Sequence, residues 1–281
     1  MSEVRIDPVL GTVVHVVGTR QERPNLPSSG CPFCVGGIEA PEPYDVRSFP
    51  NRWPAMEEDR CEVVLYTSEH LATFPSLGPA GARNVIDLWA DRTAALGARP
   101  DVDYVLVFEN RGAEVGATID HPHGQIYAYD HVPSRQSRRF AGGWQPDPDP
   151  GERWVLSRGD WAVWVPHAPM FPLSLEIAPA RLVTDLPSMI GADRDTLADV
   201  LLDVFARLDR LHERPLPYMM WLNQRPTVAE GYESAWFNVE IVSPWRGAGV
   251  PRFIAAAEIA SDEYFNPVVP EHMAARLREL G

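Results

Sequence analysis

Apolar residues recur along the chain at two spacings, one typical of helices and one typical of strands. Between residues 79 and 98 they stand three or four positions apart, and residues 193–212 repeat that pattern, so we expect a helix over each range. A third helix is expected from Pro270. Short runs rich in valine, tyrosine and tryptophan, separated by proline-rich loops, predict strands. These runs are residues 12–17, 61–67, 102–110, 121–132, 161–166, 173–179, 218–224 and 235–244, and a further apolar segment covers 251–259.

The stretch AGGWQPDPDPGE, residues 141–152, has the composition of a linker and lies near the middle of the chain. On each side of it the order is strands, a long helix, then strands. This order predicts an α+β protein with two similar lobes, residues 1–140 and 153–281. We expect each lobe to be an antiparallel sheet with packed helices.

The charge of the chain restricts its partners. The 281 residues carry a net charge of −14, which argues against nucleic acid or an anionic membrane as a partner, because such binding relies on clustered cations. All 25 basic residues are arginine, so lysine Schiff bases and the lysine of a phosphate-binding P-loop are excluded. Arginine remains suited to gripping phosphate, and any anionic substrate must meet such cations locally.

No run of about 18 apolar residues occurs, and the opening MSEVRIDPVLG is polar within three residues. We therefore expect a cytoplasmic protein.

Cys31 and Cys34 form a Cys-x-x-Cys pair, which is half of a common zinc site. The third cysteine, Cys61, falls in an expected strand, so histidines must complete such a site. His70 and His121 are the candidates. A redox role for the pair stays open, although the proline-rich loops on both sides do not resemble a thioredoxin-like setting.

The sequence HPHGQ, residues 121–125, places two histidines where we expect a strand. Residues two apart on a strand face the same way, so a metal ligand at His121 would anchor the segment that aims His123. Pro122 stiffens this segment, Gly124 is expected to let a ligand approach the backbone, and the amide of Gln125 can donate to an oxygen of the reacting group. An imidazole is a competent nucleophile toward phosphorus. The residues alone leave open whether His123 is a nucleophile or a second metal ligand.

Taken together, these motifs resemble the galactose-1-phosphate uridylyltransferase family, a branch of the histidine-triad superfamily. The resemblance extends over nearly the whole chain and is most specific in the first half. The similar segments are RIDPVLGTVVHVVGTRQERP (5–24), CPFC (31–34), PNRWPAM (50–56), FENRGAEVGATIDHPHGQIYAY (108–129), PYMMW (217–221) and PRFIAAAEI (251–259).

The resemblance implies histidine-triad-like lobes, His123 as the nucleophile and Gln125 as the residue that steadies a uridylylated intermediate. It also implies one structural zinc ion bound by Cys31, Cys34, His70 and His121. Substrate contacts are implied for Arg20 and Arg23, often across a dimer interface, for Asn51, Arg52 and Trp53 at the nucleotide, and for Asn110 and Thr118 at phosphate.

The second half departs from the family pattern. Relatives that bind a second metal use histidines and a glutamate. In this chain the segment that carries the histidines reads Trp236-Phe237-Asn238-Val239-Glu240, a further histidine position holds Asn223, and the glutamate position holds Arg139. We therefore predict no second metal. Arg252 and Glu258 fall in the hexose-contacting pattern, but an arginine replaces its lysine and an alanine its glycine. The acceptor pocket is therefore expected to be altered.

These expectations combine into a double displacement in which His123 takes a uridylyl group from a UDP-sugar and passes it to a sugar 1-phosphate. The enzyme is expected to be a homodimer. Transfer of adenylyl groups, hydrolysis of dinucleoside polyphosphates, and a catalytically silent zinc protein that binds nucleotide sugars remain the alternatives.

Overall fold

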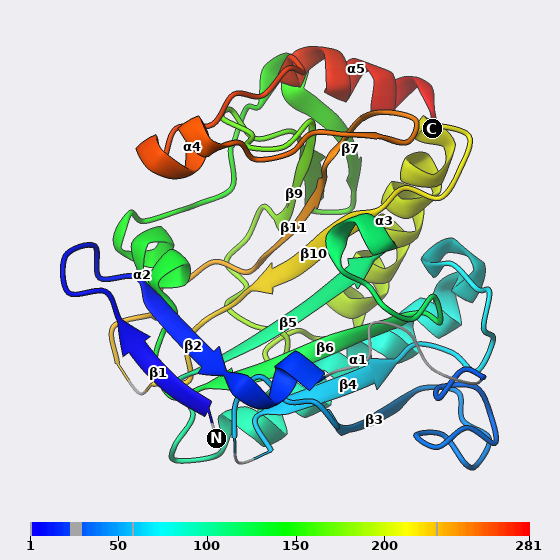
Figure 1. Ribbon diagram of the computed structural model, residues 1–281. Helices are drawn as coiled ribbons and strands as arrows, with labels where there is room; N and C mark the ends of the chain where they lie inside the picture. Colours follow the sequence, from blue (N-terminus) through cyan, green and yellow to red (C-terminus); the bar gives the residue numbers. More distant parts are fainter. Residues whose placement is uncertain (1, 23–29, 58, 229) are drawn as a thin grey trace.

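The computed structural model of the protein describes residues 2–22, 30–57, 59–228 and 230–281. One antiparallel sheet of nine strands runs through the molecule in the order β3-β4-β6-β5-β10-β11-β9-β8-β7 (Figure 1). Four strands come from the first half of the chain: β3 Arg47–Pro50, β4 Cys61–Leu65, β6 His123–Tyr129 and β5 Tyr104–Arg111. Five come from the second half: β10 Tyr218–Asn223, β11 Asn238–Ser243, β9 Leu173–Pro179, β8 Trp161–Trp164 and β7 Trp154–Arg158.

The α+β class predicted from the sequence is confirmed. The two halves do not hold separate sheets, because β5 and β10 pair edge to edge, with Tyr218 opposite Arg111 and Trp221 opposite Phe108. Both strands are rich in apolar residues, and an unpaired edge on either would leave a row of backbone groups without partners. Pairing them satisfies those groups and turns two short sheets into one long one.

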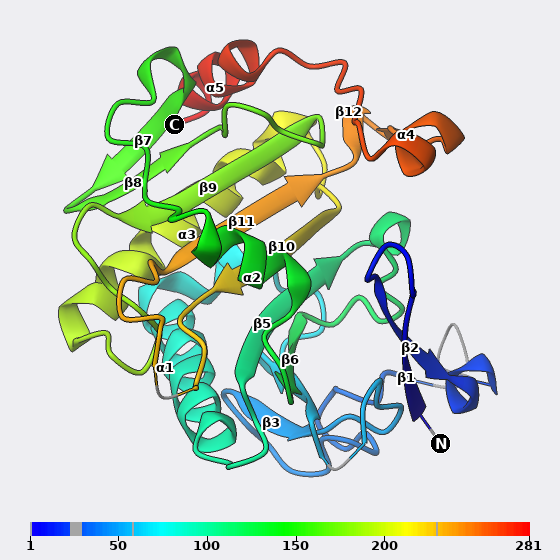
Figure 2. The ribbon, with the colours of Figure 1, turned by 90° about the vertical axis from the view of Figure 1, so that its left-hand side faces the viewer.

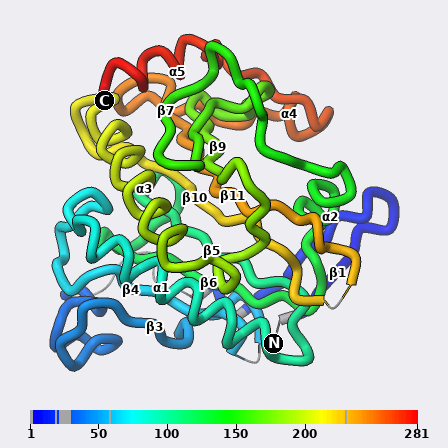
Figure 3. Tube along the Cα trace, turned by 180° about the vertical axis from the view of Figure 1, so that it is seen from behind, coloured from blue at the N-terminus to red at the C-terminus, as the bar shows by residue number. Residues whose placement is uncertain are grey.

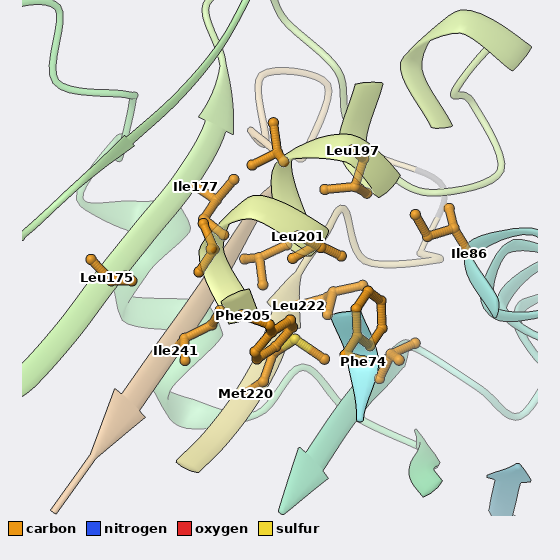
Figure 4. Close-up of a cluster of buried hydrophobic side chains, with 14 of the residues drawn as sticks. Phe74, Ile86, Leu175, Ile177, Leu197, Leu201, Phe205, Met220, Leu222 and Ile241 are labelled. Atoms are coloured by element: carbon orange, nitrogen blue, oxygen red, sulfur yellow. The ribbon is translucent and has the colours of Figure 1, made fainter. Parts of the chain in front are cut away.

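Two long helices, α1 Gly78–Gly97 and α3 Gly191–Leu211, cover one face of the sheet (Figure 3). Their bounds agree with the predicted helices to within two residues. The helix α3 presents one apolar stripe to the sheet, and full burial of an aliphatic side chain contributes about 1.5–3 kcal/mol. Figure 4 shows this core, in which Leu197, Leu201 and Phe205 of α3 lie over Leu175, Ile177, Met220, Leu222 and Ile241 of the sheet.

Shorter elements lie on the opposite face and around the rim of the sheet (Figures 1 and 2). The helix α2 Ser134–Ala141 and a hairpin of β1 Ser2–Ile6 and β2 Val13–Val17 lie on that face. The apolar segment 251–259 forms no long strand, since only Val250–Pro251 is extended as β13, paired with β12 Trp245–Gly247. The remaining helices are α4 Ala256–Ser261, α5 Pro270–Glu279, and the 3-10 turns η1 Gly18–Glu22, η2 Phe74–Leu77, η3 Ala113–Val115 and η4 Gly151–Arg153.

Candidate active site and metal centre

Four side chains from three separate segments converge next to the start of β6. The ligand atoms of Cys31, Cys34, His70 and His121 all lie within 4.8 Å of one another. Nδ1 of His70 is 3.5 Å from Sγ of Cys34, and Nδ1 of His121 is 3.7 Å from each of the two sulfurs. A tetrahedral zinc ion, with bonds of about 2.3 Å to sulfur and about 2.0 Å to nitrogen, separates its S and N ligands by about 3.5 Å. The donor set and its spacing therefore fit zinc.

The loop that carries the two cysteines is tightly wound. The amide of Gly37 donates to the carbonyl of Cys34 (2.8 Å), and that of Glu39 donates to the carbonyl of Pro32 (3.1 Å). A side chain at position 37 would place its Cβ 2.5 Å from the oxygen of Pro32, so only glycine fits there. Cys61 lies apart from this cluster, buried within β4, as the sequence predicted.

His121 is fully buried and oriented by a second hydrogen bond. Its Nε2 lies 2.7 Å from the carbonyl of Thr67, which accepts the Nε2 proton and leaves Nδ1 to face the sulfurs. Burial lowers the pKa of His121, which favours the neutral imidazole that a metal requires. Such outer contacts fix both the tautomer and the direction of a ligating histidine.

His123 opens β6, and a hydrogen bond to the backbone sets the tautomer of its ring. Nδ1 of His123 lies 2.7 Å from the carbonyl oxygen of His121 and donates its proton there. The lone pair is then on Nε2, as nucleophilic attack requires. The ring also packs against Phe33 of the cysteine loop, with centroids 5.1 Å apart. The predicted metal loop and the predicted nucleophile are therefore in direct contact.

The alternation of β6 separates the site face from the core face. His123 and Gln125 are half-buried on one face, whereas Gly124 and Ile126 are buried on the other. A side chain at position 124 would place its Cβ 2.3 Å from the hydroxyl oxygen of Tyr66. The expectation that Gly124 admits a ligand is therefore wrong, because the close approach is made by Tyr66 from the core side.

Gln125 is held by a neighbouring loop. Nδ2 of Asn51 donates to Oε1 of Gln125 (3.1 Å), and the amide of Trp53 donates to Oδ1 of Asn51 (2.9 Å). Because Oε1 of Gln125 accepts this hydrogen bond, the Nε2 group of the same amide points away from Asn51 and can donate to a ligand oxygen. The chain of contacts links the predicted nucleotide loop to the predicted catalytic strand.

Two pockets share His123 as a wall. The larger, of about 680 Å³, brings together most of the predicted site and is largely apolar on its other walls. The smaller, of about 410 Å³, is lined by Asn110, His70 and His121 together with His123. From the predicted set, the larger pocket is lined by Cys31, Cys34, Asn51, Arg52, Trp53, Thr118, His123 and Gln125.

Other predicted contacts lie elsewhere. Arg20 is half-buried near the thiol of Cys61. Burial raises the pKa of that thiol, and the charge of Arg20 offsets the rise only slightly. Arg23 lies outside the described residues. Arg252 and Glu258 line neither pocket. Both side chains are buried and form an ion pair with each other. Glu258 also accepts hydrogen bonds from the amides of Ala255 (2.8 Å) and Phe265 (3.0 Å), so this pair folds its own segment.

Comparison with known proteins decides the family. The chain is 34% identical to the galactose-1-phosphate uridylyltransferase of Thermotoga maritima, over 99% of this chain and 98% of that protein. It is 36% identical to the enzyme of the same name from Streptomyces lividans, over 99% of this chain and 87% of that protein.

The chain belongs to the galactose-1-phosphate uridylyltransferase family. The family profile described as galactose-1-phosphate uridyl transferase, N-terminal domain, matches residues 45–133. A solved structure titled "Structure of uridylyltransferase" superposes with a TM-score of 0.88 at 25% identity, covering 100% of this chain and 98% of the other.

In this member of the galactose-1-phosphate uridylyltransferase family, two of the positions where we predicted no second metal, Arg139 and Asn223, contact largely buried glutamates. The guanidinium of Arg139 pairs with Glu176 (3.1 Å) and Glu240 (3.3 Å) and stacks 3.8 Å from the ring centre of Trp144. Nδ2 of Asn223 donates to Glu240 (2.8 Å). Within the described ranges, the cysteine and histidine cluster is the one group of three or more side chains suited to a metal.

Nothing in the sequence singled out Phe33 or Tyr66, which lie against the predicted catalytic strand β6. Phe33 lies inside the Cys-x-x-Cys pair, so its position against a histidine could be inferred only once the metal cluster is assembled. Tyr66 follows β4, and its contact with Gly124 depends on the pairing of β4 with β6.

Proposed function

We propose that the protein exchanges a uridylyl group between a UDP-sugar and a sugar 1-phosphate, with His123 as the covalent carrier. Membership of the family makes the chain a transferase of uridylyl groups; the covalent step, the residues and the acceptor belong to the proposal. The observation that carries it is the hydrogen bond from Nδ1 of His123 to the carbonyl of His121, which leaves the nucleophilic lone pair on Nε2 beside a pocket of about 680 Å³.

In the first half-reaction, Nε2 of His123 attacks the α-phosphorus of the UDP-sugar. A P–N bond forms as the bond from phosphorus to the bridging oxygen breaks, and the sugar 1-phosphate departs with the electron pair. The ring gains positive charge, which the carbonyl of His121 stabilises through the retained Nδ1 proton. A second sugar 1-phosphate then reverses the sequence from the same side, so one site serves both substrates.

Gln125 steadies the phosphorus during both displacements. Because Asn51 holds Oε1 of Gln125, the Nε2 protons can point to a nonbridging oxygen without the amide having to reorient. Asn51, Arg52 and Trp53 hold the nucleotide in the larger pocket, with Thr118 on its wall. Asn110 lies two residues beyond Phe108, which pairs with Gln125, and it lines the smaller pocket together with His123. This position supports its assignment to a phosphate of the substrate.

Cys31, Cys34, His70 and His121 would hold one zinc ion. Closed by four protein ligands, such a zinc is structural and supplies folding energy rather than a reactive position. The packing of Phe33 against His123 joins the cysteine loop to β6, next to the backbone carbonyl of His121 that orients the His123 ring.

Arg252 and Glu258 would shape the acceptor side by folding the segment between β13 and α5. A homodimer is part of the proposal, with Arg20 and Arg23 directed to phosphate. It is supported by exposed apolar residues on two elements that project from the same side of the molecule, the β1–β2 hairpin and α4 (Figure 2). These residues include Ile6, Val9 and Leu10 of the hairpin and Phe253 and Ile259 at α4.

The proposed setting is the cytoplasm, with nucleotide sugar and sugar phosphate as partners rather than nucleic acid or membrane. Across the part of the chain that is described, every helix is too short or too polar to cross a lipid bilayer.

Isotope exchange tests the function. Labelled glucose 1-phosphate incubated with UDP-glucose and the enzyme should give labelled UDP-glucose without any other acceptor, because the covalent half-reaction is reversible. His123→Ala should abolish this exchange. Exchange with ADP-glucose instead would identify adenylyl transfer, release of UMP without exchange would identify a hydrolase, and no exchange with any sugar would favour a binding protein.

A further inference from the structure

The larger pocket holds an unexpected carboxylate. Among the described residues that line it, Glu39 is the single acid and Arg52 the single arginine. Oε1 of Glu39 lies 2.9 Å from Nε of Arg52, so the two side chains form an ion pair, and the Glu39 side chain is 18% exposed. The proposed function gives Arg52 a role at the nucleotide but assigns none to Glu39.

The position of Glu39 is fixed by the metal loop. Its amide donates to the carbonyl of Pro32 (3.1 Å), and the amide of Ala40 donates to the carbonyl of Gly37 (3.1 Å). The strict fit of Gly37 against Pro32 keeps this turn closed. These bonds fix the backbone of Glu39, and the ion pair with Arg52 holds one carboxylate oxygen. A carboxylate placed in this way is a preorganised acceptor for a ligand's donors.

A carboxylate in a pocket for phosphates needs a reason, because it repels the anionic part of any nucleotide. In a chain of net charge −14, a carboxylate in this pocket is costly unless it accepts hydrogen bonds from the ligand. Arg52 offsets the charge but engages only one of about four lone-pair sites that a carboxylate offers. The remaining sites can accept hydrogen bonds from a ligand.

A uridine nucleotide has two kinds of donor to offer. The ribose presents two adjacent hydroxyl groups, and the uracil ring presents a single N–H. Two neighbouring O–H groups match the two oxygens of a carboxylate, which is how acidic residues hold ribose in dinucleotide-binding folds. The flat ring is better matched by the apolar walls of the pocket, which include Phe33, Ile38 and Trp53.

We propose that Glu39, held by Arg52, accepts hydrogen bonds from the ribose hydroxyls and makes the enzyme select ribonucleotides over deoxyribonucleotides. The ligand class is the ribose diol of a nucleoside mono- or diphosphate. This inference rests on the proposed function, because it takes the larger pocket as the nucleotide site.

Calorimetric titration with UMP, 2′-deoxy-UMP and 3′-deoxy-UMP tests the proposal on the intact, metal-loaded protein. The wild type should bind UMP roughly 10- to 150-fold more tightly than at least one deoxy analogue, as expected for a hydrogen bond to a charged group. Glu39→Gln should weaken UMP binding by a similar factor and leave that analogue almost unchanged. The exposed Glu42, three positions on in the chain and outside the pocket lining, provides the matched control Glu42→Gln, which should keep the preference.

Three outcomes overturn the proposal: wild-type protein that binds all three nucleotides equally or not at all, a Glu39→Gln variant that keeps the preference, or one that binds every nucleotide more tightly. The comparison of analogues on the wild type needs no variant to fold, and zinc content and melting temperature check the variants. If nucleotides bind without discrimination while uridylyl exchange proceeds, only the role of Glu39 fails. If exchange itself is absent, the proposed function fails.

Discussion

The carbonyl oxygen of His121 lies 2.7 Å from Nδ1 of His123, so the residue that offers a metal ligand also sets the tautomer of the proposed nucleophile. The side chain of His121 faces the cysteine sulfurs, while its backbone faces the catalytic ring. In the proposed mechanism, metal binding and catalysis therefore depend on the same few backbone torsions.

Loss of one sulfur ligand should remove the metal and disturb catalysis together. Cys34→Ala is expected to lower the free energy of unfolding by more than about 4 kcal/mol and to reduce kcat more than it raises KM, because the ring of His123 loses its support. Metal analysis, chemical denaturation and steady-state kinetics measure these effects. Cys61→Ala, a buried cysteine outside the cluster, should keep the metal and most of the activity, and equal damage in both variants would refute the link.

Gly124 should tolerate no side chain while Tyr66 keeps its hydroxyl. Gly124→Ala is expected to cost about 1–3 kcal/mol of stability, because its Cβ would lie 2.3 Å from the Tyr66 oxygen. Tyr66→Phe removes that oxygen, so the double variant should recover part of the loss in a double-mutant cycle. Strictly additive effects would show that the two residues do not meet as described.

Buried Glu109 should make stability depend on pH. Burial raises its pKa from the usual 4.5 to about 7, and the hydroxyl of Tyr218, which donates at 2.6 Å, offsets this only in part. Because the folded-state pKa lies above the unfolded one, the contribution of this group is favourable below about pH 4.5 and is lost as the pH rises through about 7.

Glu109→Gln keeps the acceptor for Tyr218 and cannot ionise. Denaturant unfolding should therefore show the variant more stable than the wild type by on the order of 3 kcal/mol at pH 8, with little difference at pH 4.5. The exposed Glu114 gives the control Glu114→Gln, which should show no such pH-dependent gain. A constant difference at both pH values would mean that Glu109 is ionised throughout.

Arg139 should be essential to stability but not to metal content. Arg139→Ala removes the cation that Glu176 and Glu240 share and leaves, among the described residues, only the ion pair of Glu240 with Arg135 (2.7 Å). The variant is expected to cost about 3–5 kcal/mol. Arg138→Ala, at an exposed neighbouring position, should cost little. Atomic absorption on wild-type protein should find one zinc per chain, and two would show that a metal binds beside this cluster despite the guanidinium.

Periodicity was enough to predict the long elements. The helices α1 and α3 bury one continuous apolar stripe, and such stripes are visible in the sequence before any contact is known. The helix α2 gave no such signal, because six of its eight residues are polar and it is held by tertiary contacts such as Gln136 to Asn223 (3.3 Å). The joining of the two halves could not be predicted either, since it depends on which strand edges meet.

The candidate site could likewise be predicted only in part from the sequence. The spacing of Cys31 and Cys34 predicts a metal site. His70 follows β4 and His121 precedes β6, and the pairing of these two strands brings the histidines together. The sequence does not predict the ion pair between Arg252 and Glu258. A separation of six residues does not determine whether two side chains meet, and their contact depends on the chain turning back at Phe265. The contact of Gly124 with Tyr66 likewise depends on strand register.

Intact-protein mass spectrometry after brief incubation with UDP-glucose tests the central claim most directly. Wild-type protein should gain the mass of one uridylyl group, located by peptide mapping on His123, and should lose it again when glucose 1-phosphate is added. His123→Ala should gain nothing. Transfer that proceeds in the wild type without this adduct, or an adduct that persists in the variant, would contradict covalent catalysis at His123.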